Sequence, residues 1–171
     1  PPFGPYRRIR KLGEAVGSFV ATLNKRVLIV GTGGLSHEPP VPLLQGANDE
    51  VAEFLIAGRN PTPEFRAARQ ARTLATGQVF GTPECGLTPL NSAWDEAFIQ
   101  QMIEGRLDEV DQFDIDAISH TAGRSTHEVR TWVAAFSALR AACGSYHAQC
   151  DYYRPINEWI AGYGVVSAQG Q

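Results

Sequence analysis

The chain has 171 residues, a length that suits one domain or part of a larger one. Hydrophobic residues make up 43% of it and charged residues 19%, so it can bury a core. The formal net charge is −3, and neither a basic block nor an acidic tail is present, which argues against a nucleic-acid partner. Because no apolar run approaches the ~20 residues that span a bilayer, we expect no membrane segment.

The first part of the chain predicts a helix, a strand and a glycine-rich loop, in that order. Residues 26–30 are a short β-branched run that predicts a buried strand. Residues 31–42 hold three glycines and three prolines, so they predict a loop at the carboxyl end of that strand, the edge where open α/β sheets bind ligands. Residues 6–24 predict a helix whose apolar face consists of Ile9, Leu12, Val16, Phe19, Val20 and Leu23. A helix followed by a buried strand predicts an α/β fold.

Helices and loops alternate along the rest of the chain. We expect helices at 47–57, 61–76, 91–104, 114–123 and 125–143, and a loop rich in glycine and proline at 77–90. The inward face of the last helix is predicted to consist of Val129, Trp132, Val133, Phe136 and Leu139. The tail mixes aromatic residues with glycines and is expected to end in a strand.

The sequence has three cysteines, and their spacing matches neither a zinc site nor a C-x-x-C pair: Cys85, Cys143 and Cys150. Such a set is typical of reduced thiols, so we expect a cytoplasmic protein. The chain starts without methionine in a proline-rich stretch, residues 1–5, which we interpret as a connecting loop inside a longer protein.

The glycine loop departs from three familiar motifs. A dinucleotide fingerprint requires glycine where Ser36 stands, a P-loop requires a lysine that the loop lacks, and a nucleophile elbow requires glycine where Glu38 stands. The loop does present His37, whose imidazole titrates near neutrality and suits proton transfer. A histidine that only bonds the loop backbone explains the residues equally well.

Glu128 stands at a predicted helix start. Ser125 and Glu128 have the spacing of a capping box, in which the glutamate bonds a backbone N–H, and from the residues alone this structural role outweighs a catalytic one. His127 lies about 100° from Glu128 around a helix, so the two are not expected to chelate one metal. His120 and His147 have polar neighbours and are expected on the surface.

Several segments together resemble the class III extradiol dioxygenases, the protocatechuate 4,5-dioxygenase superfamily. They cover almost the whole chain in order: residues 12–17, 22–28, 31–42, 89–95, 122–129, 131–136 and 152–162. The stretches Gly-Gly-Leu-Ser-His and Ser-Thr-His-Glu are the most specific. The resemblance implies an α/β fold with a central sheet covered by helices, of which residues 1–171 are the carboxy-terminal half of a single catalytic domain.

The resemblance also implies a function and its residues. The implied reaction uses Fe(II) and O₂ to open a catechol that bears a carboxylated side chain, as in 2,3-dihydroxyphenylpropionate. His37 matches the residue that takes a catechol proton, and Glu128 matches the carboxylate of a site with two histidine ligands and one carboxylate ligand. The implied substrate contacts or walls of the site are Gly34, Ser36, Asn91, Asp95 and Arg154, the last suited to a substrate carboxylate.

The two iron-binding histidines of the family lie in an amino-terminal half that this sequence does not match. We therefore expect the chain alone to bind iron poorly, to expose apolar surface where that half docks, and to form a homo-oligomer as its likeness implies. Two alternatives stay open. One is a non-catalytic structural or regulatory half-domain, and the other is a phosphate- or nucleotide-binding α/β enzyme built around residues 31–34.

Overall fold

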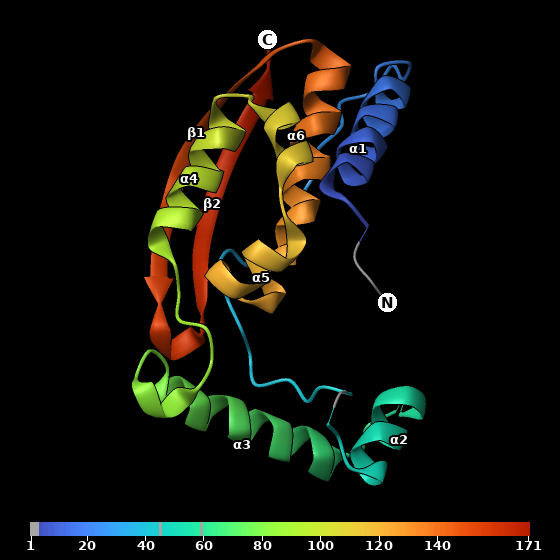
Figure 1. Cartoon of the computed structure of the whole chain (residues 1–171). Coiled ribbons are helices and arrows are strands. Elements are labelled where there is room, and N and C mark those ends of the chain that lie inside the picture. The colour runs from blue at the N-terminus through green and yellow to red at the C-terminus, as the bar shows by residue number, and fades with distance from the viewer. Residues whose placement is uncertain (1–3, 45, 59) are drawn as a thin grey trace.

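The computed structural model describes residues 4–44, 46–58 and 60–171. Its α-helices are α1 (Tyr6–Val20), α2 (Asp49–Ala57), α3 (Pro63–Val79), α4 (Ser92–Ile103), α5 (Ile115–Ala122) and α6 (Arg130–Cys143). Short 3₁₀ helices are η1 (Pro83–Cys85), η2 (Leu107–Gln112), η3 (Arg124–Val129) and η4 (Asn157–Trp159). The strands are β1 (Tyr146–Ile156) and β2 (Ala161–Gly170). Figure 1 shows a long hairpin and packed helices above, with α2 and α3 extending below.

The sheet is an antiparallel hairpin in which Tyr146 pairs with Gly170 and Ile156 with Ala161. A register shift between Cys150 and Tyr152 bends the hairpin. Helices α4 and α6 both contact it. The predicted α/β class is confirmed, and so is a strand at the end of the chain, although the sheet includes a second strand that the sequence did not predict.

The predicted strand at residues 26–30 is wrong for the described part of the chain. This segment is extended but belongs to no sheet there, and Leu28 and Val30 are 86% and 69% exposed. A strand needs a neighbour that pairs with its backbone N–H and C=O groups. Since none of the described residues provides one, the apolar run faces solvent.

Helix α1 packs on α6 through glycines. A Cβ at Gly13 would lie 2.4 Å from the Ala134 carbonyl oxygen, and one at Gly17 would lie 2.0 Å from that of Ala138. The small side chains therefore allow the two helix backbones to touch. The predicted apolar face of the first helix is packed only in part. Ile9 packs against the core, whereas Leu12, Val16 and Phe19 are 57%, 43% and 64% exposed, and Leu23, beyond the end of α1, is 37% exposed.

The core lies between α4, α6 and the hairpin. Trp94 stacks on Phe98 with ring centroids 5.4 Å apart, and Phe98 meets Trp132 edge-on at 6.2 Å. The predicted inward face of the last helix is confirmed for Val129, Trp132, Val133 and Phe136, which are buried, whereas Leu139 is half-buried. Burial of this face against α4 and the hairpin supplies the main hydrophobic stabilisation.

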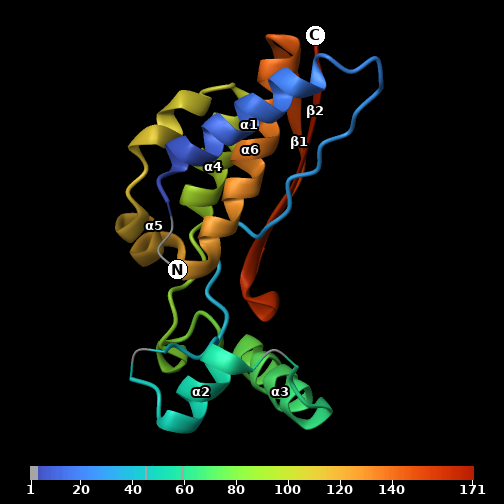
Figure 2. The same cartoon turned by 90° about the vertical axis from the view of Figure 1, so that its right-hand side faces the viewer.

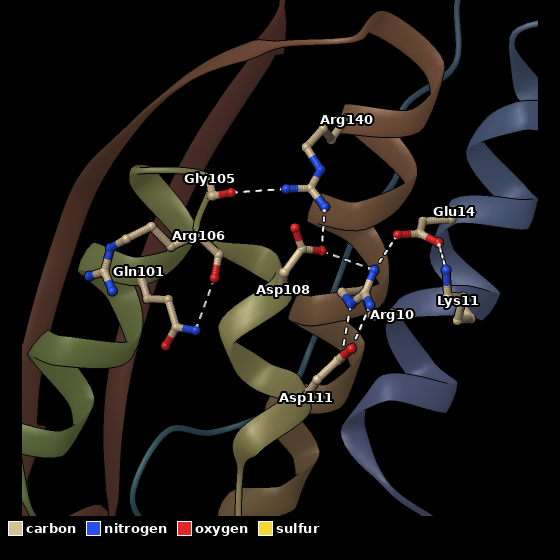
Figure 3. Close-up of polar contacts among 9 residues, drawn as sticks. All are labelled: Arg10, Lys11, Glu14, Gln101, Gly105, Arg106, Asp108, Asp111 and Arg140. Atoms are coloured by element: carbon tan, nitrogen blue, oxygen red, sulfur yellow. Dashed lines mark hydrogen bonds and ion pairs between the residues drawn. The ribbon is translucent and has the colours of Figure 1, made fainter.

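A polar cluster ties α1 to η2 (Figure 3). The buried Arg10 guanidinium donates to both carboxylate oxygens of Asp111, at 2.9 and 2.5 Å, and to Glu14 at 2.5 Å. It also lies 3.1 Å from a carboxylate oxygen of Asp108, which pairs in turn with Arg140 of α6. Because two bonds run in parallel to one carboxylate, the cluster fixes the direction of α1 as well as its position.

Helices α2 and α3 stand away from this core (Figure 2). Helix α2 buries no side chain, and the rings of Phe54 and Phe65, with centroids 4.0 Å apart, join α2 to α3. Helix α3 touches the turn of the hairpin, where a Cβ at Gly77 would lie 2.4 Å from the carbonyl oxygen of Glu158. This contact brings α3 close to the candidate site.

Candidate functional site

The glycine loop lies against η3 and the start of α6. A Cβ at Gly33, where φ is +127°, would lie 2.7 Å from the Glu128 carbonyl oxygen, and one at Gly31 would lie 2.7 Å from that of Thr131. The Trp132 indole N–H donates to the Gly33 carbonyl oxygen at 3.1 Å. The glycines therefore serve close backbone packing, and this packing carries the loop past the start of η3.

His37 is held by its backbone and by its ring. Its N–H donates to the Ala122 carbonyl oxygen at 2.9 Å, and its Nδ1 lies 2.8 Å from the Leu35 carbonyl oxygen. A carbonyl oxygen only accepts, so we assign the ring hydrogen to Nδ1, which leaves the lone pair of the neutral ring on Nε2. Nε2 is the nitrogen that faces Glu128, at 3.7 Å from Oε2.

Glu128 does not form the predicted capping box. The segment starts as η3 rather than as an α-helix, and no side chain caps it. The carboxylate turns instead toward the glycine loop, where Oε2 accepts from the Gly34 N–H at 3.3 Å. Its side chain is 58% exposed, so the carboxylate remains open to a ligand.

The two side chains share a small cavity of about 230 Å³. Its walls come from the glycine loop, α3, η3 and the hairpin turn: Gly34, His37, Pro39, Thr73, Glu128, Trp159, Ile160, Ala161 and Tyr163. An imidazole lone pair and a carboxylate that face one cavity can accept a proton and hold a cation, respectively.

The structure does not bring all the predicted site residues to this cavity. Ser36 and Asp95 are fully buried beneath the loop. Asn91 caps α4, since its side-chain oxygen accepts from the Trp94 N–H at 3.0 Å. Arg154 is exposed on β1, opposite Tyr163, and is not among the lining residues. Only His37, Glu128 and Gly34 of the predicted set line the cavity.

The sequence missed the far wall of the cavity. Trp159 and Tyr163 lie there with ring centroids 5.3 Å apart, edge to face, and Trp159 is 64% exposed. Ile160, between them in the chain, has a left-handed φ of 57° and is buried. The sequence shows that the tail is rich in aromatic residues, but it gives no clear signal for the tight hairpin turn that brings these rings into the wall of the cavity.

The donor set fits an iron(II) site only in part. Glu128 has the right chemistry and exposure for one ligand. Within residues 4–44, 46–58 and 60–171, however, no three His, Cys, Asp or Glu side chains are grouped to hold a metal ion. A complete site therefore requires ligands beyond the described residues.

The remaining histidines lie elsewhere. His127 is buried, with Tyr6 Oη at 3.0 Å from Nδ1 and Ser119 Oγ at 2.9 Å from Nε2. Burial and the nearby Arg130 guanidinium lower the pKa of His127. His120 and His147 are exposed, as predicted.

The fold is α/β, and an imidazole and a carboxylate line one of its cavities, as in a site for proton transfer beside a cation. Sequence comparison gives the family. The family described as the catalytic LigB subunit of aromatic ring-opening dioxygenase matches residues 2–164, and the chain belongs to it.

Curated relatives agree with this family. The chain is 77% identical over 168 residues to the 2,3-dihydroxyphenylpropionate/2,3-dihydroxicinnamic acid 1,2-dioxygenase 1 of Dechloromonas aromatica, covering 98% of this chain and 54% of that protein. It is 75% identical to the enzyme of that name from Azotobacter vinelandii and 69% identical to that of Xanthobacter autotrophicus, each over 99% of this chain and 54% of the relative. The chain thus spans about half the length of these relatives.

Among the described residues, no helix is long and apolar enough to cross a membrane.

Proposed function

We propose that this chain is the part of an extradiol ring-cleaving dioxygenase that supplies the proton-transfer histidine and one carboxylate ligand of an iron(II) site. The observation that carries the proposal is the 3.7 Å separation of His37 Nε2 and Glu128 Oε2 at one cavity. The names of the relatives support a catechol with a carboxylated side chain, of the 2,3-dihydroxyphenylpropionate type, as the substrate.

His37 acts as the base. With Nδ1 on the Leu35 carbonyl, the ring presents a lone pair at Nε2 to a catechol hydroxyl in the cavity. The imidazolium formed in this step lies beside the Glu128 carboxylate, whose charge stabilises it. The same contact holds the proton near the reacting oxygen for later return.

Glu128 is the proposed iron ligand of this chain, and two histidines of the unmatched part of the longer protein are the proposed partners. The bond from the Gly34 N–H orients the carboxylate, as bonds to ligating carboxylates commonly do. When bound, iron(II) supplies the electron transfer that lets O₂ react with a catechol. The Trp159 and Tyr163 rings suit the flat face of the substrate.

Arg154 remains the proposed partner of the substrate carboxylate. It pairs across the hairpin with Tyr163, and cross-strand partners share one face of a sheet. Since Tyr163 lines the cavity, the Arg154 guanidinium starts from a position near its rim. The carboxylated side chain would extend toward it.

The remainder of the longer protein is the proposed cover for the apolar surfaces. A groove of about 690 Å³ runs between the end of α1, residues 25–31, α6 and β2. Leu28, at 86% exposed, lines this groove. A second half that packs here would supply a strand partner for residues 26–30. It would also complete the iron site, because the family's iron-binding histidines belong to it.

The other two hypotheses are weaker. Phosphate binding needs free backbone N–H groups, but the Gly34 N–H already donates to the Glu128 carboxylate, whose charge repels an anion. A non-catalytic half-domain has no observation in its favour, and the experiment below tests it.

Two further properties belong to the proposal. The cysteines Cys85, Cys143 and Cys150 are all free thiols, which supports a cytoplasmic location. A homo-oligomer rests on the family likeness alone.

The decisive experiment combines this chain with the part of the Dechloromonas relative that it does not match. Iron(II) is added without oxygen, followed by 2,3-dihydroxyphenylpropionate and O₂. We expect a yellow ring-fission product that disappears in His37→Ala and Glu128→Ala and persists in His120→Ala, where the imidazole is exposed away from the cavity. Absence of product in the unaltered assembly favours the non-catalytic half-domain, and product in both site variants defeats the residue assignment.

A further inference from the structure

Asp95 is a buried carboxylate that the proposed chemistry does not use. It lies in the first turn of α4 with no exposed surface. Oδ1 accepts from the Ser36 N–H at 2.7 Å, and Oδ2 accepts from the Ser36 hydroxyl at 2.7 Å and from the Tyr153 hydroxyl at 2.9 Å. Three donors from two other segments therefore converge on one carboxylate.

The three contacts to Asp95 suit its carboxylate form, which accepts from every donor around it. The Ser36 hydroxyl already accepts from the Asn91 N–H at 3.0 Å, so its own hydrogen is available for Asp95. Burial raises the pKa of Asp95, and the bonds from Ser36 and Tyr153 act in the opposite direction because they stabilise the carboxylate. An ionised acceptor makes stronger bonds than a neutral one, so the Ser36 contact is a firm anchor.

This anchor acts on the residue directly before His37. The Ser36 carbonyl oxygen accepts from the Gly162 N–H at 2.9 Å, and the Leu35 N–H donates to the Gly162 carbonyl oxygen at 3.2 Å. The fit is close, because a Cβ at Gly162 would lie 2.2 Å from Asp95 Oδ2. The loop is thus clamped between the hairpin on one side and α4 beneath.

We propose that Asp95 is a positioning residue, which acts through Ser36 to fix the loop so that the His37 ring keeps Nδ1 on the Leu35 carbonyl and Nε2 toward Glu128. Complete burial excludes the expected role in the wall of the site. The inference deepens the proposed function and rests on it for its kinetic readout. A histidine that must accept a proton at a defined atom loses efficiency when its ring can turn or shift.

The test uses matched variants in the combined protein described above. Asp95→Ala removes the anchor, and Asp95→Asn keeps an acceptor for the Ser36 N–H. Ser36→Ala removes the hydroxyl, and with it the bond to Asp95 and the bond from the Asn91 N–H, but keeps the bond from the Ser36 N–H to Asp95. Tyr146→Phe is the control, because it also deletes a hydroxyl bond between β1 and α4, to the Met102 carbonyl, but has no bond to the loop. Thermal melting identifies the variants that remain folded.

We expect kcat to fall on the order of 100-fold in Asp95→Ala and roughly 10-fold in Ser36→Ala, because a catalytic group misplaced by about 1 Å can lose this much rate. KM should stay within about a factor of three of its value in the unaltered protein. Asp95→Asn recovers part of the loss, and Tyr146→Phe stays within about a factor of two. If Ser36→Ala and Asp95→Asn match the control, the positioning role is wrong.

A second readout needs no activity. Nitrogen NMR of the His37 ring, assigned by its loss in His37→Ala, reports which nitrogen carries the hydrogen. We expect one Nδ1–H tautomer in the unaltered protein and in Tyr146→Phe, and a mixture in Ser36→Ala. If the unaltered protein forms no ring-fission product, the proposed function fails, and the tautomer alone decides the role of Asp95. If the His37 tautomer is unchanged in Ser36→Ala, the positioning role of Asp95 is wrong.

Discussion

Two sides of the molecule follow different packing rules. On one side, α4, α6 and the hairpin bury an interlocked core, in which Met102, Leu107 and Val133 have no exposed surface. On the other, several apolar side chains of residues 20–44 and of the helices α2 and α3 are exposed to water, Leu28 at 86% and Ile56 at 73% among them. Both sides contain apolar residues, so composition does not distinguish the buried side from the exposed one.

This contrast means that an apolar pattern predicts which surface is to be covered but not which element covers it. The apolar face of α1 was read correctly as a face, but glycines on another side make the contact with α6. The candidate site lies between the two sides, with His37 on the open side's loop and Glu128 on η3 of the packed side. Four predictions test this contrast, from the largest expected effect on stability to the smallest.

The largest effect is expected at the contact between α1 and α6. Gly17→Ala places a Cβ 2.0 Å from the Ala138 carbonyl oxygen, and a backbone atom cannot yield as a side chain does. We expect the free energy of unfolding to fall by about 3 kcal/mol or more, at the upper end for overpacking. Denaturant titration measures it. Gly4→Ala is the control, with its nearest contact at 3.7 Å to a flexible arginine; equal effects would refute the close packing.

The second effect concerns the polar cluster of Figure 3. Arg10→Ala leaves Asp111, whose side chain is 18% exposed, without its two parallel bonds. We expect a loss of about 3 kcal/mol, since a nearly buried charge loses its partner. The bonds from Arg10 lower the pKa of Asp111, so this stabilisation is present above the ordinary carboxylate range and disappears as pH falls through the lowered value.

Arg106→Ala is the matched control for Arg10. Its pairs with Glu104 and Glu109 lie on the surface, where solvent screens them. We expect no measurable change in its denaturation midpoint. A large change there would mean that surface charge, and not the buried cluster, stabilises the position of α1.

The third effect is a pH dependence at His127. Because burial and Arg130 lower its pKa below the ordinary 6.5, the unfolded chain takes up a proton before the folded one does. The contribution of neutral His127 to the free energy of unfolding is therefore fully present above about pH 6.5 and decreases as the pH falls toward the lowered pKa of His127. We expect His127→Asn to lose less stability than the unaltered chain between about pH 7.5 and about pH 5. The control His120→Asn should retain the original slope; a slope unchanged in His127→Asn would contradict the assignment.

The smallest effect on stability is expected on the open side. Leu28→Lys should change the free energy of unfolding of the chain by less than about 0.5 kcal/mol, because the side chain is 86% exposed. It should nevertheless weaken association with the unmatched part of the Dechloromonas relative at least roughly 10-fold, measured by titration calorimetry, since a charge would enter an apolar interface. Gln70→Lys, exposed on α3 and lining neither the apolar groove nor the cavity, is the control for added charge. Equal weakening in both variants would place the interface elsewhere.

Much of the secondary structure could be predicted from local pattern. The helix caps of α4 and α5 follow from Asn91 and Asp114, whose side chains accept the expected backbone N–H groups. The strand at 26–30 was predicted wrongly, because a run of β-branched residues does not show whether a partner strand lies beside it, and none of the described residues pairs with this segment. The start of the last helix was also predicted wrongly, because residues 124–129 form η3. There the Thr126 hydroxyl donates to the Ala122 carbonyl oxygen and accepts from the distant His37 N–H, a contact that the local pattern does not record.

The α/β class and the family could be predicted from sequence patterns, which also point to His37 and Glu128 as the residues of the proposed chemistry. Only the folded structure shows that these side chains share a cavity and that Trp159 and Tyr163 form its far wall. It also shows that Asp95 is buried and bonded to Ser36. A sequence motif reflects interactions between residues that are close along the chain. The distance between His37 and Glu128, which are 91 positions apart, depends instead on how the helices and the hairpin pack. That packing is a property of the whole set of contacts.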